Sequence, residues 1–243
     1  MNSVDHHSPV ITPGRDKSRS DILTRIRTAT RKNPLHDNDK AEQRLSHPTA
    51  GIIPARGNLG AEGQIKLFCE EASKVNASLA RIAKRSDIPA EIGRFLGEKN
   101  LPSTIKLAPD PAVSELDWSS QPLLETSIGP AAPSDSASIS HAFAGVAETG
   151  TLMFLSGPHN PTTLNYLPPT HIALVQAADI CGNYEQVWTR LRAESDALGQ
   201  EFMPRTVSMI TGPSRTADID QTLLLGIHGP LHLHIVIIDE EKQ

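Results

Sequence analysis

Apolar residues recur at intervals of three and four along four segments of the chain, and this period is typical of amphipathic helices. It predicts helices over residues 16–32, 61–83, 88–99 and 184–198. The second of these has the longest apolar stripe, formed by Ile65, Phe68, Cys69, Ala72, Val75 and Leu79. Pro89 stands in the first turn of the third helix, a position that proline favours.

Shorter apolar segments predict strands over residues 104–108, 142–147, 151–155, 172–176, 207–211 and 231–238. The last of them is almost continuously aliphatic, as expected for a strand that is covered on both faces. The Pro- and Ser-rich residues 109–140 are expected to be mostly irregular. Because strands alternate with helices, we expect an α/β fold with a largely parallel sheet flanked by helices.

The N-terminal part of the chain differs from the rest. We expect residues 1–15 to be disordered, and residues 33–59, which are rich in Pro, Gly, Asn and Asp, to form a loop or linker. The predicted organisation is therefore an N-terminal helix with a flexible linker over residues 1–60, followed by an α/β domain over residues 61–243.

Composition narrows the class of protein. The 243 residues carry a net charge of −5, which argues against nucleic-acid binding because that requires clustered Lys and Arg. Cys69 and Cys181 fit no cluster or zinc spacing, so we expect buried free thiols. We find neither a signal-peptide pattern nor an apolar segment of membrane-spanning length, and we expect a cytoplasmic protein.

Ligands of open α/β sheets bind beyond the carboxyl ends of the strands, and three polar loops are candidates. In residues 145–161, Glu148 and Gly150 lie between two predicted strands. Glu148 is a candidate base or hydrogen-bond acceptor, or the exposed carboxylate of a hairpin turn. In residues 165–175, His171 follows two prolines and is a candidate ligand or proton carrier, or a structural imidazole.

The third loop, residues 209–230, is predicted to turn from a strand into a short helix. The free N–H groups of such a helix bind anions, Ser214 adds a hydroxyl, and Arg215 adds a bidentate clamp. Asp218 either favours the first turn or holds Arg215 in place. After the helix, a Gly-Pro pair fixes the position of His228. The alternative is a crossover connection with ordinary helix capping.

Two other signals are weaker. His228, His232 and His234 lie close together in the sequence, but neither a cysteine nor a carboxylate completes a metal-ligand spacing, so we expect no metal site. The glycine-rich motifs GxGxxG and GxxxxGK[ST] are absent from the sequence, which argues against a dinucleotide site of the Rossmann type and against a nucleotide hydrolase.

Together, the segments AETGTLMFLSGPHNPTTLNYLPPTHIALV, ITGPSRTADID and GIHGPLHLHIVIID resemble the lactate-utilisation protein C family, whose members carry a LUD domain. The resemblance covers residues 60–243. It implies a Rossmann-like α/β sheet, similar to the superfamily of sugar-phosphate isomerases and CoA-transferases. It also implies a role in bacterial oxidation of L-lactate to pyruvate, without a cofactor of its own, beside partner subunits that hold iron–sulfur clusters.

The residues at the family's site positions are Glu148, Thr149, Gly150, His171, Gly212, Ser214, Arg215, Thr216, Asp218, His228 and Gly229. We expect Glu148, His171 and His228 to be catalytic and the others to bind a ligand. The main hypothesis is a non-redox component of a lactate-oxidising system that binds a small carboxylate or phosphate, iron–sulfur subunits, or both. The alternative is a stand-alone isomerase or acyl/CoA-transferase-like enzyme that uses Glu148 as base or nucleophile.

Overall fold

The computed structural model describes residues 13–31, 43–44, 49, 51–197, 204–219 and 222–240. The chain divides into two units, Met1–Gly51 and Ile52–Gln243. In the first, helix α1 spans Pro13–Arg31, and its Ile22 and Ile26 are more than half exposed. Most of the N-terminal segment that we expect to be disordered, residues 1–12, lies outside the described residues. The expected domain boundary at residue 60 stays a prediction.

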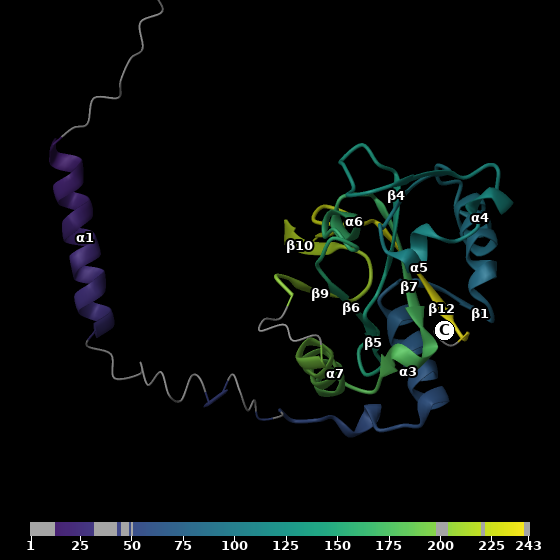
Figure 1. The fold of residues 1–243 in the computed structure, drawn as a ribbon, viewed down its shortest axis with the longest axis horizontal. Helices are drawn as coiled ribbons and strands as arrows, with labels where there is room; N and C mark the ends of the chain where they lie inside the picture. The colour runs from purple at the N-terminus through teal and green to yellow at the C-terminus, as the bar shows by residue number, and fades with distance from the viewer. Residues whose placement is uncertain are drawn as a thin grey trace, which may run out of the picture. The chain divides into compact units, whose positions relative to one another are not determined.

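A six-stranded parallel sheet forms the centre of the second unit (Figure 1). From one edge to the other its strands are β1 (Ser78–Ile82), β12 (His232–Ile238), β7 (Thr170–Gln176), β4 (Ala137–His141), β2 (Thr104–Leu107) and β3 (Glu125–Ile128). All five pairings are parallel. The predicted α/β class, with a largely parallel sheet flanked by helices, is therefore confirmed.

Both faces of this sheet are covered. On one face, Ile172 and Leu174 of β7 pack with helix α4 (Ile88–Glu98). On the other face, the intervening Ala173 and Val175 pack with helix α3 (Ala61–Lys74). Because alternate side chains of a strand point to opposite faces, burial on both faces favours the continuous aliphatic runs at residues 172–175 of β7 and 235–238 of β12.

A smaller sheet lies beside α3 and contributes to the same apolar cluster. Its order is β8 (Ile180–Cys181), β5 (Ala144–Val146), β6 (Thr151–Leu155) and β9 (Val207–Ile210). Leu152 and Phe154 of β6 pack in the cluster under α3, whereas Met153 packs with Val187 of helix α7 (Tyr184–Ala197). The β5–β6 hairpin is thus held between the main sheet and α7.

Short elements complete the described chain. They are η1 (Ala55–Gly57), η2 (Arg85–Asp87), α5 (Pro111–Ser114), η3 (Trp118–Ser120), α6 (Thr163–Tyr166), η4 (Ala177–Asp179), β10 (Arg215–Ile219) and β11 (Thr222–Leu225). None of the helices in the described parts of the chain has the length and apolar content needed to cross a bilayer.

The structure corrects two of the predicted segments. The helix expected over residues 61–83 ends at Lys74, because Asn76 adopts a left-handed backbone conformation with φ of 67° and residues 78–82 form strand β1. Residues 109–140, expected to be mostly irregular, contain β3 and the first residues of β4. Strand β4 is buried between neighbours, although ASISH shows little of the usual strand composition.

The turn of the β5–β6 hairpin packs directly on α3. Gly150 has φ of 64°, and a Cβ atom at this position would lie 2.3 Å from the backbone nitrogen of Ala72. Glycine is therefore required here twice, for the backbone conformation and for the close approach of helix and turn.

Two histidines in the core are completely enclosed. His171 is fully buried, and burial lowers its pKa to about 3. His234 stacks on Phe95 with ring centroids 4.0 Å apart, and burial lowers its pKa to about 4 although the charge of Glu91 opposes this. Both imidazoles are therefore neutral at physiological pH, and folding favours their neutral forms.

The Gly150→Ala substitution should lower the free energy of unfolding by about 2 kcal/mol or more, because the added methyl group meets backbone that cannot move aside. Gly97→Ala is the matched control, since α4 leaves open space around Gly97. It should change stability by less than about 1 kcal/mol, in the stabilising direction. Urea unfolding measures both, and equal effects would contradict the packing described for the turn.

Stability should fall as the pH drops below about 6.5, the pKa of histidine in an unfolded chain. Because the folded-state pKa values of His171 and His234 are depressed, the unfolded state binds protons first, and stability is lost progressively down to about pH 4 for His234 and about pH 3 for His171. Each histidine should account for about 2 kcal/mol between pH 6.5 and pH 5.

Urea unfolding of the His171→Gln variant at the same pH values should show a loss smaller by about 2 kcal/mol. The exposed His159, changed to Gln, is the control and should leave the pH dependence of unfolding as it is in the parent protein. An unchanged slope in the His171 variant would show that this imidazole does not titrate differently in the folded and unfolded states.

Candidate functional site

The carboxylate of Glu148 is buried at the start of α7. Glu148 is 5% exposed, and its Oε1 accepts a hydrogen bond of 3.4 Å from the backbone nitrogen of Tyr184. Its Oε2 has no hydrogen-bond partner among the described residues. The free N–H groups and the dipole of a helix N-terminus stabilise a carboxylate there. Glu148 is thus a buried carboxyl group at the tip of a hairpin, rather than an exposed turn residue.

Four hydroxyl groups beside Glu148 join three parts of the chain. The Oγ1 atom of Thr151 lies 2.7 Å from that of Thr149, 2.8 Å from the hydroxyl of Tyr184 and 2.7 Å from Oγ1 of Thr211. This network connects the hairpin turn to α7 and to the residue that follows β9. It therefore fixes the beginning of the third predicted loop next to the first.

The helix that we predict in residues 209–230 is wrong. Arg215–Ile219 and Thr222–Leu225 form the antiparallel hairpin β10–β11, in which Thr216 pairs with Leu224. Gly226 follows β11 with φ of 77° and does not end a helix. Two β-branched residues in β10 and alternating polar and apolar positions favour strands here. The helix N-terminus that was expected to bind an anion is therefore not present in this loop.

Several polar groups of this loop, among those that the structure describes, bond to the protein itself. The backbone nitrogen of Ser214 donates to the carbonyl of Pro230 at 2.8 Å, and the Ser214 hydroxyl accepts from the backbone nitrogen of His228 at 3.3 Å. The guanidinium of Arg215 donates to the carbonyl of Val75. Gly212 lies against the same residue, and Gly229 lies next to Ser214. The side chains of Thr216 and Asp218 are outside the described residues.

His171 lies at the amino end of its strand, whereas we expected it at the end of the sheet where the carboxyl ends of the strands meet. It is the second residue of β7, and strands β7 and β12 run parallel, with His171 beside Leu233. Its Nε2 is 2.8 Å from the hydroxyl of Ser140, which itself donates to Asn165 at 3.0 Å, so Nε2 carries the proton. Its Nδ1 has no partner among the described residues. The geometry is that of a structural imidazole enclosed by protein.

The predicted site residues therefore do not form one site; they lie in separate groups. The Glu148 turn and Gly212 both lie along the end of α3, at Ala72 and Val75. Ser214, His228 and Gly229 lie near the amino ends of β7 and β12, where His232 N donates to the carbonyl of Pro169. Of the three loops expected at the carboxyl ends of the strands, only the last part of the first, residues 155–160, lines the cavity found there. The catalytic and binding roles assigned above stay predictions.

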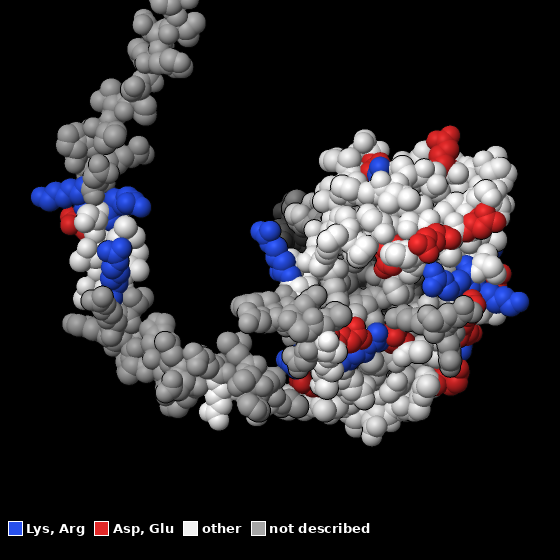
Figure 2. Space-filling model, in the orientation of Figure 1, with Lys and Arg blue, Asp and Glu red and all other residues white. Residues whose placement is uncertain are grey.

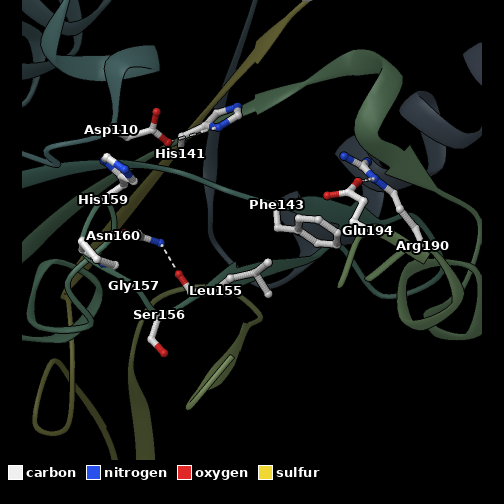
Figure 3. A pocket seen from close by; sticks show the side chains of 11 residues that line it. Asp110, His141, Phe143, Leu155, Ser156, Gly157, His159, Asn160, Arg190 and Glu194 are labelled. Carbon is white, nitrogen blue, oxygen red and sulfur yellow. Dashed lines mark hydrogen bonds and ion pairs between the residues drawn. The ribbon is translucent and has the colours of Figure 1, made fainter. Parts of the chain in front are cut away.

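A cavity of about 300 Å³ opens at the carboxyl ends of β2 and β4 (Figure 3). Asp110 and His141, which follow or end these strands, stand at one end of the cavity, and His159 and Asn160 lie close to them. The Nδ1 atom of His141 is 3.8 Å from Oδ2 of Asp110. Asp110 is fixed because its Oδ1 accepts from the backbone nitrogen of Ala112 and caps α5.

The other end of the cavity is formed by α7. Arg190 donates through Nη1 to Asp179 at 2.7 Å and through Nε to Glu194 at 2.8 Å, and its Cζ lies 4.6 Å from the ring centre of Phe143. Burial alone would lower the pKa of Arg190, but its two carboxylate partners raise it, so the guanidinium stays charged. A half-buried cation on a cavity wall is a natural partner for an anionic ligand.

The turn that contains Asn160 supplies a hydrogen-bond acceptor. Asn160 is 8% exposed, and its Nδ2 donates to the carbonyl of Leu155 at 3.2 Å, which fixes the orientation of the amide. Its Oδ1 has no hydrogen-bond partner among the described residues. Leaving a buried acceptor without a partner costs about 1–3 kcal/mol.

A second cavity, of about 560 Å³, lies between α3 and β1. Two cations line it, Lys66 and Arg81. Arg81 is already engaged: Nε donates to Asp239, and both terminal nitrogens donate to Glu62. We take the first cavity, called the carboxyl-edge cavity below, as the candidate anion site because a half-buried guanidinium, that of Arg190, lies in its wall. On the face of the second unit shown in Figure 2, Lys and Arg side chains are interspersed with Asp and Glu and do not form one basic surface.

Sequence reasoning missed the residues of this cavity, namely Asp110, His141, His159, Asn160, Arg190 and Glu194. One signal could have found some of them, because residues 145–161 were identified as a ligand loop and include His159 and Asn160. Within this loop we predicted Glu148, which lies at the other end of the same hairpin. Among the described residues, we find no group of three or more His, Cys, Asp or Glu that could hold a metal ion.

Comparison with known proteins places the chain in a family. The LUD domain model matches residues 65–238. An uncharacterized protein of Neisseria meningitidis serogroup B is 40% identical over 102 residues, which are 42% of each chain. A lactate utilization protein C of Macrococcus caseolyticus is 31% identical over 96 residues, 40% of this chain and 41% of that one. These alignments span less than half the length of either relative.

A solved structure agrees with the fold. The crystal structure of a DUF162 family protein from Deinococcus radiodurans superposes with a TM-score of 0.53, covering 74% of this chain and 99% of the other at 17% identity. At this identity the likeness concerns the fold alone. Since the family model extends from α3 to β12, through the main sheet and the β5–β6 hairpin, this chain belongs to the LUD domain family.

Proposed function

We propose that this protein is a component of a bacterial L-lactate utilisation system, in which it binds an organic anion and holds no redox centre of its own. The lactate role is supported by membership of the LUD domain family and by relatives named lactate utilization protein C. We assign the anion to the carboxyl-edge cavity rather than to the loop that contains Arg215.

The observation that carries this assignment is the position of Arg190. Its Nε and Nη1 bond to protein carboxylates, while Nη2 has no partner that the described residues show. Its partner Glu194 is about half exposed, and pairs of this kind on a helix surface stabilise by only about 0.3–0.5 kcal/mol. An incoming carboxylate can displace Glu194 at little cost, while the buried Asp179 keeps the guanidinium in place.

We also propose that iron–sulfur subunits of the same system carry out electron transfer, in the cytoplasm, as the resemblance to the lactate-utilisation proteins implies. The two cysteines support the proposal that this chain holds no iron–sulfur cluster. Cys69 and Cys181 are partly buried, not fully buried as we expected, each against a separate apolar cluster, and this burial raises the pKa of each thiol. A raised thiol pKa disfavours the thiolate form that a cluster ligand needs.

A second candidate function is acyl transfer through Glu148. Its support is the buried carboxylate with an unpartnered Oε2 at the start of α7. In such a reaction Oε2 would attack a thioester carbonyl, releasing the CoA thiolate and leaving an acyl–glutamyl anhydride. Incubation with acetyl-CoA followed by mass spectrometry would detect that adduct, and its absence in the native protein would rule out this alternative.

Deletion of the gene from its host should abolish growth on L-lactate and leave growth on pyruvate unchanged, because the block precedes pyruvate. A plasmid that carries the intact gene should restore growth on lactate. Normal growth of the deletion strain on L-lactate as sole carbon source would contradict the proposed role.

Replacement of Arg190 by Lys should weaken binding of L-lactate about tenfold, because the planar donor fork is lost while the charge beside Asp179 is kept. The matched control is Arg192→Lys, two residues further along α7 and outside the cavity lining. Isothermal titration calorimetry measures both affinities. Equal affinities in the two variants would place the anion elsewhere in the protein.

A further inference from the structure

The carboxyl-edge cavity has two chemically different ends. Figure 3 shows Arg190, Glu194 and Phe143 on one side, and Asp110, His141, His159 and Asn160 grouped on the other. The first end offers guanidinium N–H donors. The second carries the carboxylate of Asp110 and the amide of Asn160, whose Oδ1 is buried and has no hydrogen-bond partner among the described residues. A ligand that satisfies both ends must carry an anionic group and, at a distance from it, hydrogen-bond donors.

The acceptor end is held rigidly by the protein. The amide of Asn160 cannot rotate without losing the hydrogen bond from Nδ2 to the carbonyl of Leu155. One oxygen of Asp110 caps the N-terminus of α5, and the other, Oδ2, lies 3.8 Å from Nδ1 of His141 at the same end of the cavity. Preorganised acceptors of this kind discriminate strongly between a ligand that carries hydroxyl groups and one that lacks them.

The size of the cavity points to a ligand longer than lactate. Its volume of about 300 Å³ is at the lower end of the range for small-molecule sites and corresponds to about ten water molecules at ~30 Å³ each. A three-carbon acid held by Arg190 would leave most of this space, and the acceptor end, to water. A longer chain can reach from the guanidinium to Asn160.

We propose that this cavity binds an open-chain polyhydroxy carboxylate, with its carboxylate on Arg190 and its distal hydroxyl groups donating to Asn160 and Asp110. This inference rests on the anion site of the proposed function and names the chemical class of its preferred ligand. Lactate then occupies only the Arg190 end. The polyhydroxy acid gains the second set of hydrogen bonds and binds more tightly.

Glu194 competes with the ligand for the guanidinium. Its Oε1 accepts from Nε of Arg190 four residues earlier on α7, and its side chain is about half exposed. When a ligand carboxylate binds, Glu194 turns out to solvent, and its removal in advance should favour binding. The Arg94–Glu98 pair on α4 has the same spacing and lies outside the cavity lining, so it provides a matched control.

Calorimetric titration of the full chain with three acids tests the inference. The probes are D-gluconate, hexanoate of the same chain length without hydroxyl groups, and L-lactate. D-Gluconate should bind at least tenfold more tightly than either of the others, the scale of one to two hydrogen bonds to fixed acceptors. Glu194→Gln should tighten all three acids several-fold, whereas Glu98→Gln should leave them unchanged.

Two variants at the Asn160 and Asp110 end of the cavity test whether these residues bind the hydroxyl groups. Their affinity for hexanoate shows whether the cavity is intact. Asn160→Leu removes the acceptor, and Asp110→Asn keeps the helix cap while it replaces the cavity-side oxygen by a donor. Each should remove most of the preference for D-gluconate over hexanoate, while hexanoate affinity stays within about twofold and reports an intact cavity. Should Asn160→Leu fail to fold, Asp110→Asn alone decides the matter.

The outcomes distinguish this inference from the proposed function. If the three acids bind the native protein with equal affinity and Arg190→Lys weakens all of them, the anion site stands and the polyhydroxy acid is overturned. The same holds if D-gluconate is preferred but both acceptor variants keep that preference. If none of the three acids binds, the anion site itself is wrong, and the inference falls with it.

Discussion

The parallel register of β4, β7 and β12 is the constraint on which the rest of the structure depends. It sends the carboxyl ends of these strands to one edge and their amino ends to the other. Two histidines at opposite ends of neighbouring strands therefore have different surroundings. His141 ends β4 beside a cavity, whereas His171 begins β7 and is enclosed by Ser140 and the ring of Phe154. Position along a strand, rather than residue type, decides which imidazole a ligand can meet.

The β5–β6 hairpin and α7 form a wall of the cavity at the carboxyl ends of β2 and β4. One end of the hairpin places Gly150 on α3 and Glu148 at the start of α7. The other end supplies Phe143 and Leu155 to the cavity, where Arg190 approaches from the middle of α7. The same two elements thus hold a buried anion at one end and a half-buried cation at the other. Displacement of the hairpin would disturb both.

Elements that are buried on both faces could be predicted from the sequence, because β7 is aliphatic over residues 172–175, β12 is aliphatic over residues 235–238, and β6 matches its expected bounds. Strand β1 was hidden because Leu79 continues the apolar stripe of α3, and only the left-handed Asn76 separates them. The hairpin at residues 215–225 has apolar residues whose spacing also fits a helix. In the site, His141 and Arg190 carry no local signal, since one lies in the plain segment ASISH and the other resembles a solvated helix position.

The central claim is that ligands bind at the carboxyl edge of the sheet, in the cavity lined by Arg190 and Asn160, and not at the loops around Glu148 and Arg215. A crystal structure of the protein soaked with D-gluconate tests this most directly. The account predicts density between the two residues, with a carboxylate on the guanidinium and a hydroxyl within hydrogen-bond distance of Oδ1. Density beside Glu148 or Arg215, with the cavity containing only water, would contradict it.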